Sequence, residues 1–254
     1  MHSAPPSISA DPRPAPPLAP GIYPLRALRA LRELVRNPDD TRHVFTVIES
    51  LSGRAPLRLL ARFRRSTNGK RLLASRSQIL PLLRDRARLH SMPEGSLGRA
   101  YLAFLEREKI SADGLVQASI DGDTGLVPAG GDFEYLGDRL RDTHDLWHTV
   151  TGYQGDLYGE ASLLAFTGMQ VRNPGIAVIV LTALLQARDP RLAQLIWRGI
   201  ASGARAEWLP PVEWESLLPL PLDEVRRRLR IEPVASYQTV RTGELRRIGE
   251  LAPA

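Results

Sequence analysis

The sequence predicts an all-α protein that forms a single bundle-like domain of about seven to nine helices. Three observations lead to this prediction. Apolar residues recur at helical spacing, strand-like alternation is scarce, and Gly, Pro, Ser and Asn punctuate the helical segments. The 254 residues, 43% of them hydrophobic and 24% charged, are enough for a sizeable core, and they contain no internal repeat.

The first helix is predicted over Leu25–Arg36. Its Leu and Val residues cover one half of a helical wheel, and its Arg residues cover the other half. Such a basic amphipathic helix can lie on an anionic membrane surface or can cap a bundle with a solvated Arg face, and the pattern leaves both open. Residues 1–24 carry eight prolines and no apolar signal-peptide core, so a disordered Pro-rich lead-in is expected there.

The remaining helices follow from apolar periodicity and from the breakers between them. Helical segments are predicted over residues 41–51, 56–65, 78–89, 96–109, 133–151, 156–171, 175–185, 191–208 and 222–229. A Gly-rich loop is expected over residues 121–131. The apolar run Gly175–Leu185 is about half the roughly 20 residues of a spanning helix, so it predicts a buried core helix that begins at Pro174. The helical domain is therefore expected over residues 25–232, with a poorly ordered tail over 233–254.

The composition excludes several classes of site. Without cysteine there is no disulfide, thiolate nucleophile, iron-sulfur cluster or Cys-type zinc finger, so any metal must be held by His, Asp or Glu. The net charge of +6 is uneven, because residues 25–90 contain 15 Arg and one Lys against five acidic residues. Phe45 and Phe63 alone do not provide the interleaved aromatic residues of a nucleic-acid site, so no nucleic-acid partner is expected.

The segment from Arg141 to Glu160 contains the candidate metal-binding residues. Taking His144 as the origin of a helical wheel, His148 lies near 40° and Asp145 near 100°, so the two imidazoles form a natural metal clip. Glu160 lies twelve residues later, beyond a turn at Gly152 and Gly155, where the next helix can bring it back to the clip. The predicted ligands are His144, Asp145, His148 and Glu160, a set that accepts zinc but also manganese, iron or cobalt.

The His-Asp-x-x-His pattern is similar to the metal-binding motifs of two hydrolase classes. The HExxH peptidases carry a Glu as general base directly after the first His, where this chain has the shorter Asp145, so a peptidase is not favoured. The HD-type metal phosphohydrolases add an upstream His and a downstream Asp, which here would be His43 or His90 with Asp156. Neither His lies in a second signature, so this class is the enzyme runner-up. Arg141 and Tyr153 flank the clip, where a surface ion pair and a core packing residue are the expected roles.

The spacing His144-Asp145-x-x-His148, then eleven residues and Glu160, resembles the signature of the coenzyme Q biosynthesis protein 4 family. The resemblance covers roughly residues 25–232 and includes MPEGSLG from Met92 with Tyr101 and Phe104, Arg141, Gly159, Gln170, Pro174, Trp197 to Ala204, Trp214-Glu215 and LDEVRRRLRI from Leu222. The segment ASLLAFTGM after Glu160 lacks the Lys and second Glu associated with the family. The Pro-rich start replaces an organelle-targeting segment, which indicates a bacterial homologue.

The resemblance implies an all-helical protein of the ubiquinone (coenzyme Q) pathway that binds a polyprenylated hydroxybenzoate-type precursor. The implied activity is a metal-dependent oxidative C1 decarboxylation, a carbon-carbon lyase reaction. His144, Asp145, His148 and Glu160 would be its catalytic residues, holding a divalent metal for which zinc is the first choice. As a Lewis acid the ion would stabilise the negative charge left when CO₂ departs. The alternative is a non-catalytic, lipid-binding scaffold that organises the quinone-biosynthesis enzymes.

The same resemblance implies a location and partners. Removing a polyprenyl tail from a bilayer costs about 0.8 kcal/mol per CH₂, so a protein acting on its head group should dock on the membrane surface. The expected location is the bacterial cytoplasm, peripheral to the inner face of the cytoplasmic membrane. The expected partners are the prenylated precursor, other quinone-biosynthesis enzymes and a second copy of the chain in a homodimer.

Overall fold

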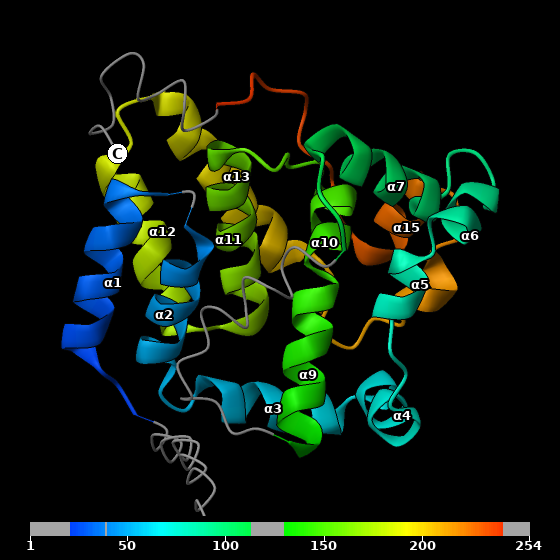
Figure 1. Ribbon diagram of the computed structural model, residues 1–254, viewed down its shortest axis with the longest axis horizontal. Coiled ribbons are helices and arrows are strands. Elements are labelled where there is room, and N and C mark those ends of the chain that lie inside the picture. The colour runs from blue at the N-terminus through cyan, green and yellow to red at the C-terminus, as the bar shows by residue number, and fades with distance from the viewer. Residues whose placement is uncertain (1–20, 39, 113–129, 241–254) are drawn as a thin grey trace, which may run out of the picture.

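The computed structural model describes residues 21–38, 40–112 and 130–240. These residues form an all-α protein without strands, apart from an isolated bridge between Ser96 and Pro221, and the predicted fold class is confirmed (Figure 1). The helices of this described part are α1 (Pro24–Arg36), α2 (Thr41–Ser52), α3 (Ala55–Arg65), α4 (Thr67–Ser75), α5 (Leu80–Arg84), α6 (Arg86–Ser91), α7 (Leu97–Glu108), α9 (Gly131–Asp142), α10 (His144–Thr151), α11 (Leu157–Val171), α12 (Pro174–Gln186), α13 (Pro190–Arg205), α14 (Trp214–Leu217) and α15 (Leu222–Leu229).

The described residues form fourteen helices, more than the seven to nine predicted for the bundle: α4 and α14 are added to the ten segments predicted by residue range, and two of those segments are divided. Asp85 separates α5 from α6 and accepts a hydrogen bond from the Arg88 amide, as a helix cap does. Thr143 separates α9 from α10. Its hydroxyl donates to the carbonyl of Arg139, the kind of side-chain bond that bends helices. The helices α4 and α14 were not predicted.

The helices α11 and α13 make the most extensive contact of the fold, near the centre of the view in Figure 1. Two glycines of α13 allow it. A Cβ on Gly199 would lie 2.3 Å from the carbonyl oxygen of Ser162, and one on Gly203 would lie 2.5 Å from that of Phe166. Because real Cβ atoms essentially never approach oxygen so closely, only glycine permits this separation of the two backbones.

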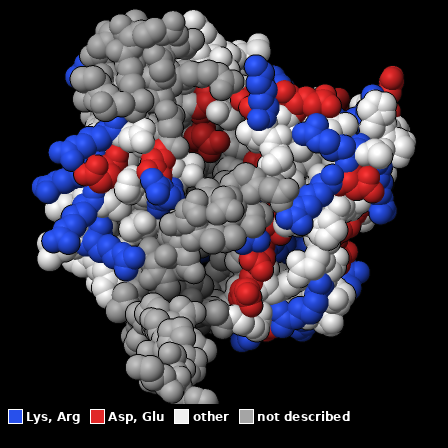
Figure 2. Space-filling model, viewed as in Figure 1, with Lys and Arg blue, Asp and Glu red and all other residues white. Residues whose placement is uncertain are grey.

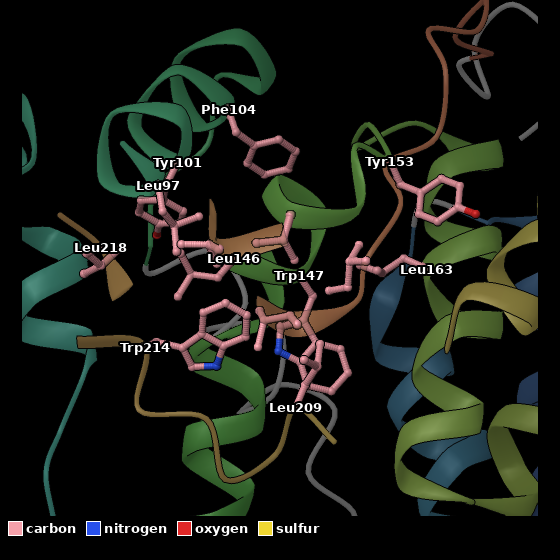
Figure 3. Close-up of a cluster of buried hydrophobic side chains, with 14 of the residues drawn as sticks. Leu97, Tyr101, Phe104, Leu146, Trp147, Tyr153, Leu163, Leu209, Trp214 and Leu218 are labelled. Atoms are coloured by element: carbon pink, nitrogen blue, oxygen red, sulfur yellow. The ribbon is translucent and has the colours of Figure 1, made fainter. Parts of the chain in front are cut away.

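The main hydrophobic core surrounds α10 and holds it in place. Figure 3 shows Leu146 and Trp147 of α10 among side chains from α7, α11 and the segment around α14. The side chains drawn with labels are Leu97, Tyr101, Phe104, Leu146, Trp147, Tyr153, Leu163, Leu209, Trp214 and Leu218. Every residue of α10 from Asp145 to Thr151 is buried, so burial of apolar surface fixes the position of this helix on several sides.

The helices α1 and α12 lie together at one edge of the molecule (Figure 1), where Ala30 and Ile179 share a small hydrophobic cluster. Both helices form where the sequence predicts them. Their apolar faces are only partly covered, however, since Leu25 of α1 is 72% exposed and Leu185 of α12 is 78% exposed. The buried core helix predicted over residues 175–185 is therefore buried on one side only. None of the described helices is both long enough and apolar enough to span a membrane.

Residues 233–240 fall in the predicted tail, and in the structure they run along the domain as an extended segment that we call the C-terminal strap. The amide of Val234 donates to the carbonyl of Thr151 at 2.8 Å, and the side chains of Val234, Tyr237 and Val240 pack against the main core. The first 20 residues of the predicted lead-in, most of the predicted loop over 121–131, and residues 241–254 lie outside the described residues.

Candidate metal centre

Three side chains from two consecutive helices converge on one point. They are His144 and His148 of α10 and Glu160 of α11. The two imidazole Nε2 atoms lie 3.2 Å apart, Glu160 Oε1 lies 3.2 Å from His148 Nε2, and Glu160 Oε2 lies 3.6 Å from His144 Nε2. Over residues 21–38, 40–112 and 130–240, this is the group of His, Asp and Glu side chains whose spacing could hold a metal ion.

Local geometry explains the convergence. The i, i+4 spacing places both imidazoles on one face of α10, and α10 ends at Gly152, whose φ of 83° suits glycine. Asp156 then caps α11 by accepting hydrogen bonds from the amides of Tyr158 and Gly159, both at 3.3 Å. Glu160 therefore lies in the first turn of α11, facing back towards the imidazoles.

The ring of His148 is held on two sides. It is buried and stacks on Phe104, with ring centroids 5.2 Å apart and an angle of 19° between the planes. Its Nδ1 lies 3.1 Å from the carbonyl oxygen of Tyr153. A carbonyl oxygen can only accept, so Nδ1 carries the proton and donates, and in the neutral ring Nε2 presents its lone pair to the centre of the site.

The electrostatics of the three groups favour a positive charge between them. Burial disfavours the charged form of His148, but the Glu160 carboxylate and then Asp145 raise its pKa above the ordinary value. Burial would likewise raise the pKa of Glu160, yet the charge of His148 and hydrogen bonds from both imidazoles hold that pKa well below its usual range.

The fourth predicted ligand, Asp145, does not join the other three. Its side chain is buried beside the site. Burial raises the pKa of its carboxyl above the ordinary value, although the charges of His144 and His148 act in the opposite direction. The helical wheel gives the reason, because Asp145 points about 100° away from His144, whereas His148 lies within about 40°. The structure thus brings together three of the four predicted residues, and a ligand role for Asp145 stays a prediction.

The additional ligands of a phosphohydrolase are not assembled in the described part of the chain. His43 lies on α2, where its Nε2 is 3.5 Å from Asp40, and His90 lies on α6. Neither belongs to the group of His144, His148 and Glu160. Asp156 is occupied as the cap of α11. The runner-up class therefore has no structural counterpart in these residues.

Next to the site lies a cavity of about 1130 Å³, above the range of roughly 300 to 1,000 Å³ that is usual for ligand pockets. His144, Glu160 and Arg141 contribute to its wall, and the rest of the lining is mostly apolar, including Val44, Phe45, Ile48, Leu164, Ile176 and Ile179. The sequence does not predict this cavity, because its wall comes from helices far apart in the chain.

The two residues that flank the clip form an ion pair and a core contact, although the ion pairs of Arg141 are partly buried and not at the surface as expected. Arg141 forms ion pairs with Asp138 at 2.8 Å and with Asp142 at 2.9 Å. Tyr153 is buried, its hydroxyl donates to the carbonyl of Leu195 at 3.2 Å, and burial raises its pKa to about 12. Tyr153 is thus a core residue that offers a carbonyl, not a hydroxyl, to the site.

Comparison with known proteins places this geometry in a family. The model of the family described as coenzyme Q (ubiquinone) biosynthesis protein Coq4 matches residues 24–235. Among curated relatives, the mitochondrial ubiquinone biosynthesis protein coq4 of Aspergillus clavatus is 31% identical over 177 residues, which span 68% of this chain and 60% of the relative. The mitochondrial COQ4 homolog of Bos taurus is 30% identical over 202 residues, 76% of this chain and 72% of the relative.

A solved structure supports the fold. The crystal structure of a candidate ubiquinone biosynthesis protein from Nostoc punctiforme superposes with a TM-score of 0.59 and covers 82% of this chain and 98% of that one, at 22% identity. The match to the family model spans nearly the whole described domain, including His144, His148 and Glu160. The chain therefore belongs to the Coq4 family of coenzyme Q biosynthesis proteins.

Proposed function

We propose that this chain acts in ubiquinone biosynthesis as a metal-dependent oxidative decarboxylase of a polyprenylated hydroxybenzoate-type precursor. The names of its relatives support the pathway, and the site supports the chemistry. The observation that carries the proposal is the convergence of His144, His148 and Glu160 beside a large apolar cavity, whose wall includes His144 and Glu160. A polar head group in the cavity can reach His144 and Glu160, while His148 stays buried and the cavity encloses an apolar tail.

The donor set fits a divalent cation. Two imidazoles and a carboxylate are the protein ligands of many catalytic zinc sites, which leave further positions open. Ligand atoms about 2.0 to 2.2 Å from a tetrahedral zinc ion are separated by roughly 3.3 to 3.6 Å, and the separations here are 3.2, 3.2 and 3.6 Å. When bound, the ion would supply Lewis-acid stabilisation of the negative charge that develops on the substrate.

The residues of the chain have separate tasks in this reaction. The apolar lining, which includes Val44 and Ile176, holds the prenyl tail and excludes water, while His144 and Glu160 face the head group. The C1 carboxyl group leaves as CO₂ and a hydroxyl group replaces it. The exchange removes two electrons in all, so an oxidant of the class of dioxygen must enter as a co-substrate: with water supplying the hydroxyl oxygen, dioxygen takes up the two electrons and leaves as hydrogen peroxide. Fixed side chains orient the ring for this exchange.

Complementation tests this proposal. A ubiquinone-producing strain that lacks its own Coq4 protein should recover ubiquinone when it expresses the unaltered chain. With Glu160→Gln, which keeps the shape of the side chain and removes its charge, we expect the strain to accumulate the carboxylated precursor at matched protein levels. Quinones and precursors are quantified by mass spectrometry. Normal ubiquinone with Glu160→Gln would instead indicate the non-catalytic scaffold.

We also propose that α1 contacts an anionic membrane surface. Arginines gather over α1 in Figure 2, and within the described residues neither Arg29 nor Arg32 forms an ion pair. Leu25 and Leu28 of the same helix are 72% and 43% exposed. Exposed leucines can enter the acyl-chain boundary of a bilayer while neighbouring unpaired arginines contact its anionic head groups. The homodimer and contacts with other quinone-biosynthesis enzymes stay predictions.

Reversing charge on α1 should weaken membrane binding. Each Arg near an anionic surface contributes about 1 kcal/mol, so losing two of them through Arg29→Glu with Arg32→Glu should lower partitioning onto phosphatidylglycerol-containing vesicles by at least roughly 30-fold, and repulsion of the two new carboxylates adds to the loss. The measurement is co-sedimentation with vesicles at low and high salt. Arg227→Glu with Arg228→Glu on α15, which lies at the opposite side in Figure 1, changes the net charge equally and should have little effect. Equal loss in both double variants would contradict a specific role of α1.

A further inference from the structure

The C-terminal strap contacts the loop between the two helices that carry the metal ligands. This loop, residues 152–156, joins the end of α10 to the cap of α11. The Val234 amide donates to the carbonyl of Thr151 at 2.8 Å, and the Leu157 amide donates to the carbonyl of Val240 at 3.2 Å. The strap is thus hydrogen-bonded at both ends of the loop, once to the last turn of α10 and once to the first residue of α11.

Tyr237 lies between these two points and forms two hydrogen bonds through one hydroxyl. The oxygen accepts from the amide of Gln154 at 2.9 Å, and the hydroxyl donates to Asp156 Oδ1 at 2.7 Å. Burial is the main reason that the pKa of Tyr237 is raised above its ordinary value, and the hydrogen bond to Asp156 raises it further. The hydroxyl therefore stays protonated and acts as a donor to Asp156 at all ordinary pH values.

Asp156 collects hydrogen bonds from both sides of this contact. Its carboxylate is buried and accepts from the amides of Tyr158 and Gly159 in α11, from the Tyr237 hydroxyl, and from the Val240 amide at 2.9 Å. Its own carbonyl accepts from the amide of Glu160 at 2.8 Å. One buried carboxylate thus joins the strap to the turn of helix that presents Glu160.

The approach of Tyr237 to the first turn of α11 leaves no room for a side chain at position 159. A Cβ on Gly159 would lie 2.5 Å from the Tyr237 hydroxyl oxygen and 2.0 Å from the carbonyl oxygen of Gln154. The other side of the loop reaches the second ligand, because the carbonyl of Tyr153 holds Nδ1 of His148 at 3.1 Å. The loop contacted by Tyr237 therefore determines the orientation of His148 and the position of Glu160 together.

We propose that the C-terminal strap fixes the distance between the imidazoles and the carboxylate of the metal site, with Tyr237 as the positioning residue. Tyr237 touches neither metal ligand and acts through Gln154 and Asp156. Outer-shell hydrogen bonds of this kind change metal affinity about 10- to 100-fold when they are removed. The inference rests on the proposed metal site and adds a residue to it that lies 77 positions after Glu160.

Metal binding by a matched pair of Tyr variants tests the inference. Tyr237→Phe removes the hydroxyl at the loop. Tyr135→Phe is the control, because the Tyr135 hydroxyl also donates one hydrogen bond, to the carbonyl of Ser77 at 2.9 Å, but lies on α9 away from the strap. Zinc affinity is measured by calorimetry, and the coordination geometry is read from the visible absorption of bound Co²⁺. Circular dichroism checks that each protein is folded.

We expect Tyr237→Phe to bind zinc at least about ten-fold more weakly and to change the Co²⁺ spectrum, while Tyr135→Phe stays within about two-fold of the unaltered chain. A folded Tyr237→Phe protein with unaltered affinity and spectrum would overturn the inference and leave the metal site standing. Equal weakening by both variants would overturn it as well, since a general loss of stability would then explain the result. Failure of the unaltered chain to bind either metal would overturn the metal site and this inference together.

Discussion

The His148→Ala protein should bind zinc more than about 100-fold more weakly than the unaltered chain, and it should restore no ubiquinone in a strain lacking Coq4. A lost ligand costs more than the roughly 10- to 100-fold effect of an outer-shell partner. The remaining pair, His144 and Glu160, is 3.6 Å apart and would have to hold the ion with one imidazole and one carboxylate. Isothermal titration with zinc measures the affinity, and mass spectrometry measures the quinone.

Two further variants keep this prediction interpretable. His148 is buried against Phe104, so its removal also leaves a hole in the core. His144→Ala affects a more exposed ring of the same pair and should lose zinc affinity comparably with less loss of stability. His90→Ala changes an exposed histidine on α6 and should retain both zinc affinity and ubiquinone production. Tight zinc binding by both the His144→Ala protein and the His148→Ala protein would show that the cation is held at another site.

Gly199→Leu should lower the free energy of unfolding by about 3 kcal/mol and the Tm by roughly 6 to 12 °C. The first side-chain carbon would meet the carbonyl oxygen of Ser162 at 2.3 Å, and neither backbone can yield without moving α13 away from α11. Because α11 also carries Glu160, we expect the same variant to weaken zinc binding. Thermal and urea unfolding followed by circular dichroism measure the change in stability.

The control for this variant is a glycine without neighbours. Nothing described lies within 4 Å of a Cβ built on Gly137 of α9. Gly137→Ala should therefore increase the free energy of unfolding by about 0.5 to 1 kcal/mol, because alanine loses less conformational entropy in a helix. A Gly199→Leu protein as stable as the unaltered chain would mean that α11 and α13 are further apart than described here.

Local patterns in the sequence were enough to predict the core of the site. Two His at i, i+4 must share a helix face, and Gly152 followed by the capping Asp156 returns the chain, so His144, His148 and Glu160 could be predicted to meet. Asp145 is the exception. Adjacent residues on a helix point about 100° apart, and the wheel did not decide whether its short side chain could reach the other three.

Contacts between distant segments could not be predicted from the sequence. Tyr237 and Asp156 meet because the strap packs along the core, and no periodic pattern in residues 233–240 signals that path. The large cavity could not be predicted from the sequence either. Its wall takes a few apolar residues from each of α1, α2, α9 and α12, and in the sequence these residues have the pattern of ordinary core positions. The bend at Thr143 depends on one side-chain bond to Arg139, a detail that helix periodicity does not contain.

The strap also bears on when the site can form during synthesis. The ribosome makes α10 and α11 well before residues 233–240, so a nascent chain holds both imidazoles and Glu160 without Tyr237 or Val240 in place. Asp156 then has only its helix-capping amides as partners. If the strap fixes the ligand spacing, tight loading of the ion must wait until residues 233–240 have been synthesised, by which point α13, α14 and α15 have already been made.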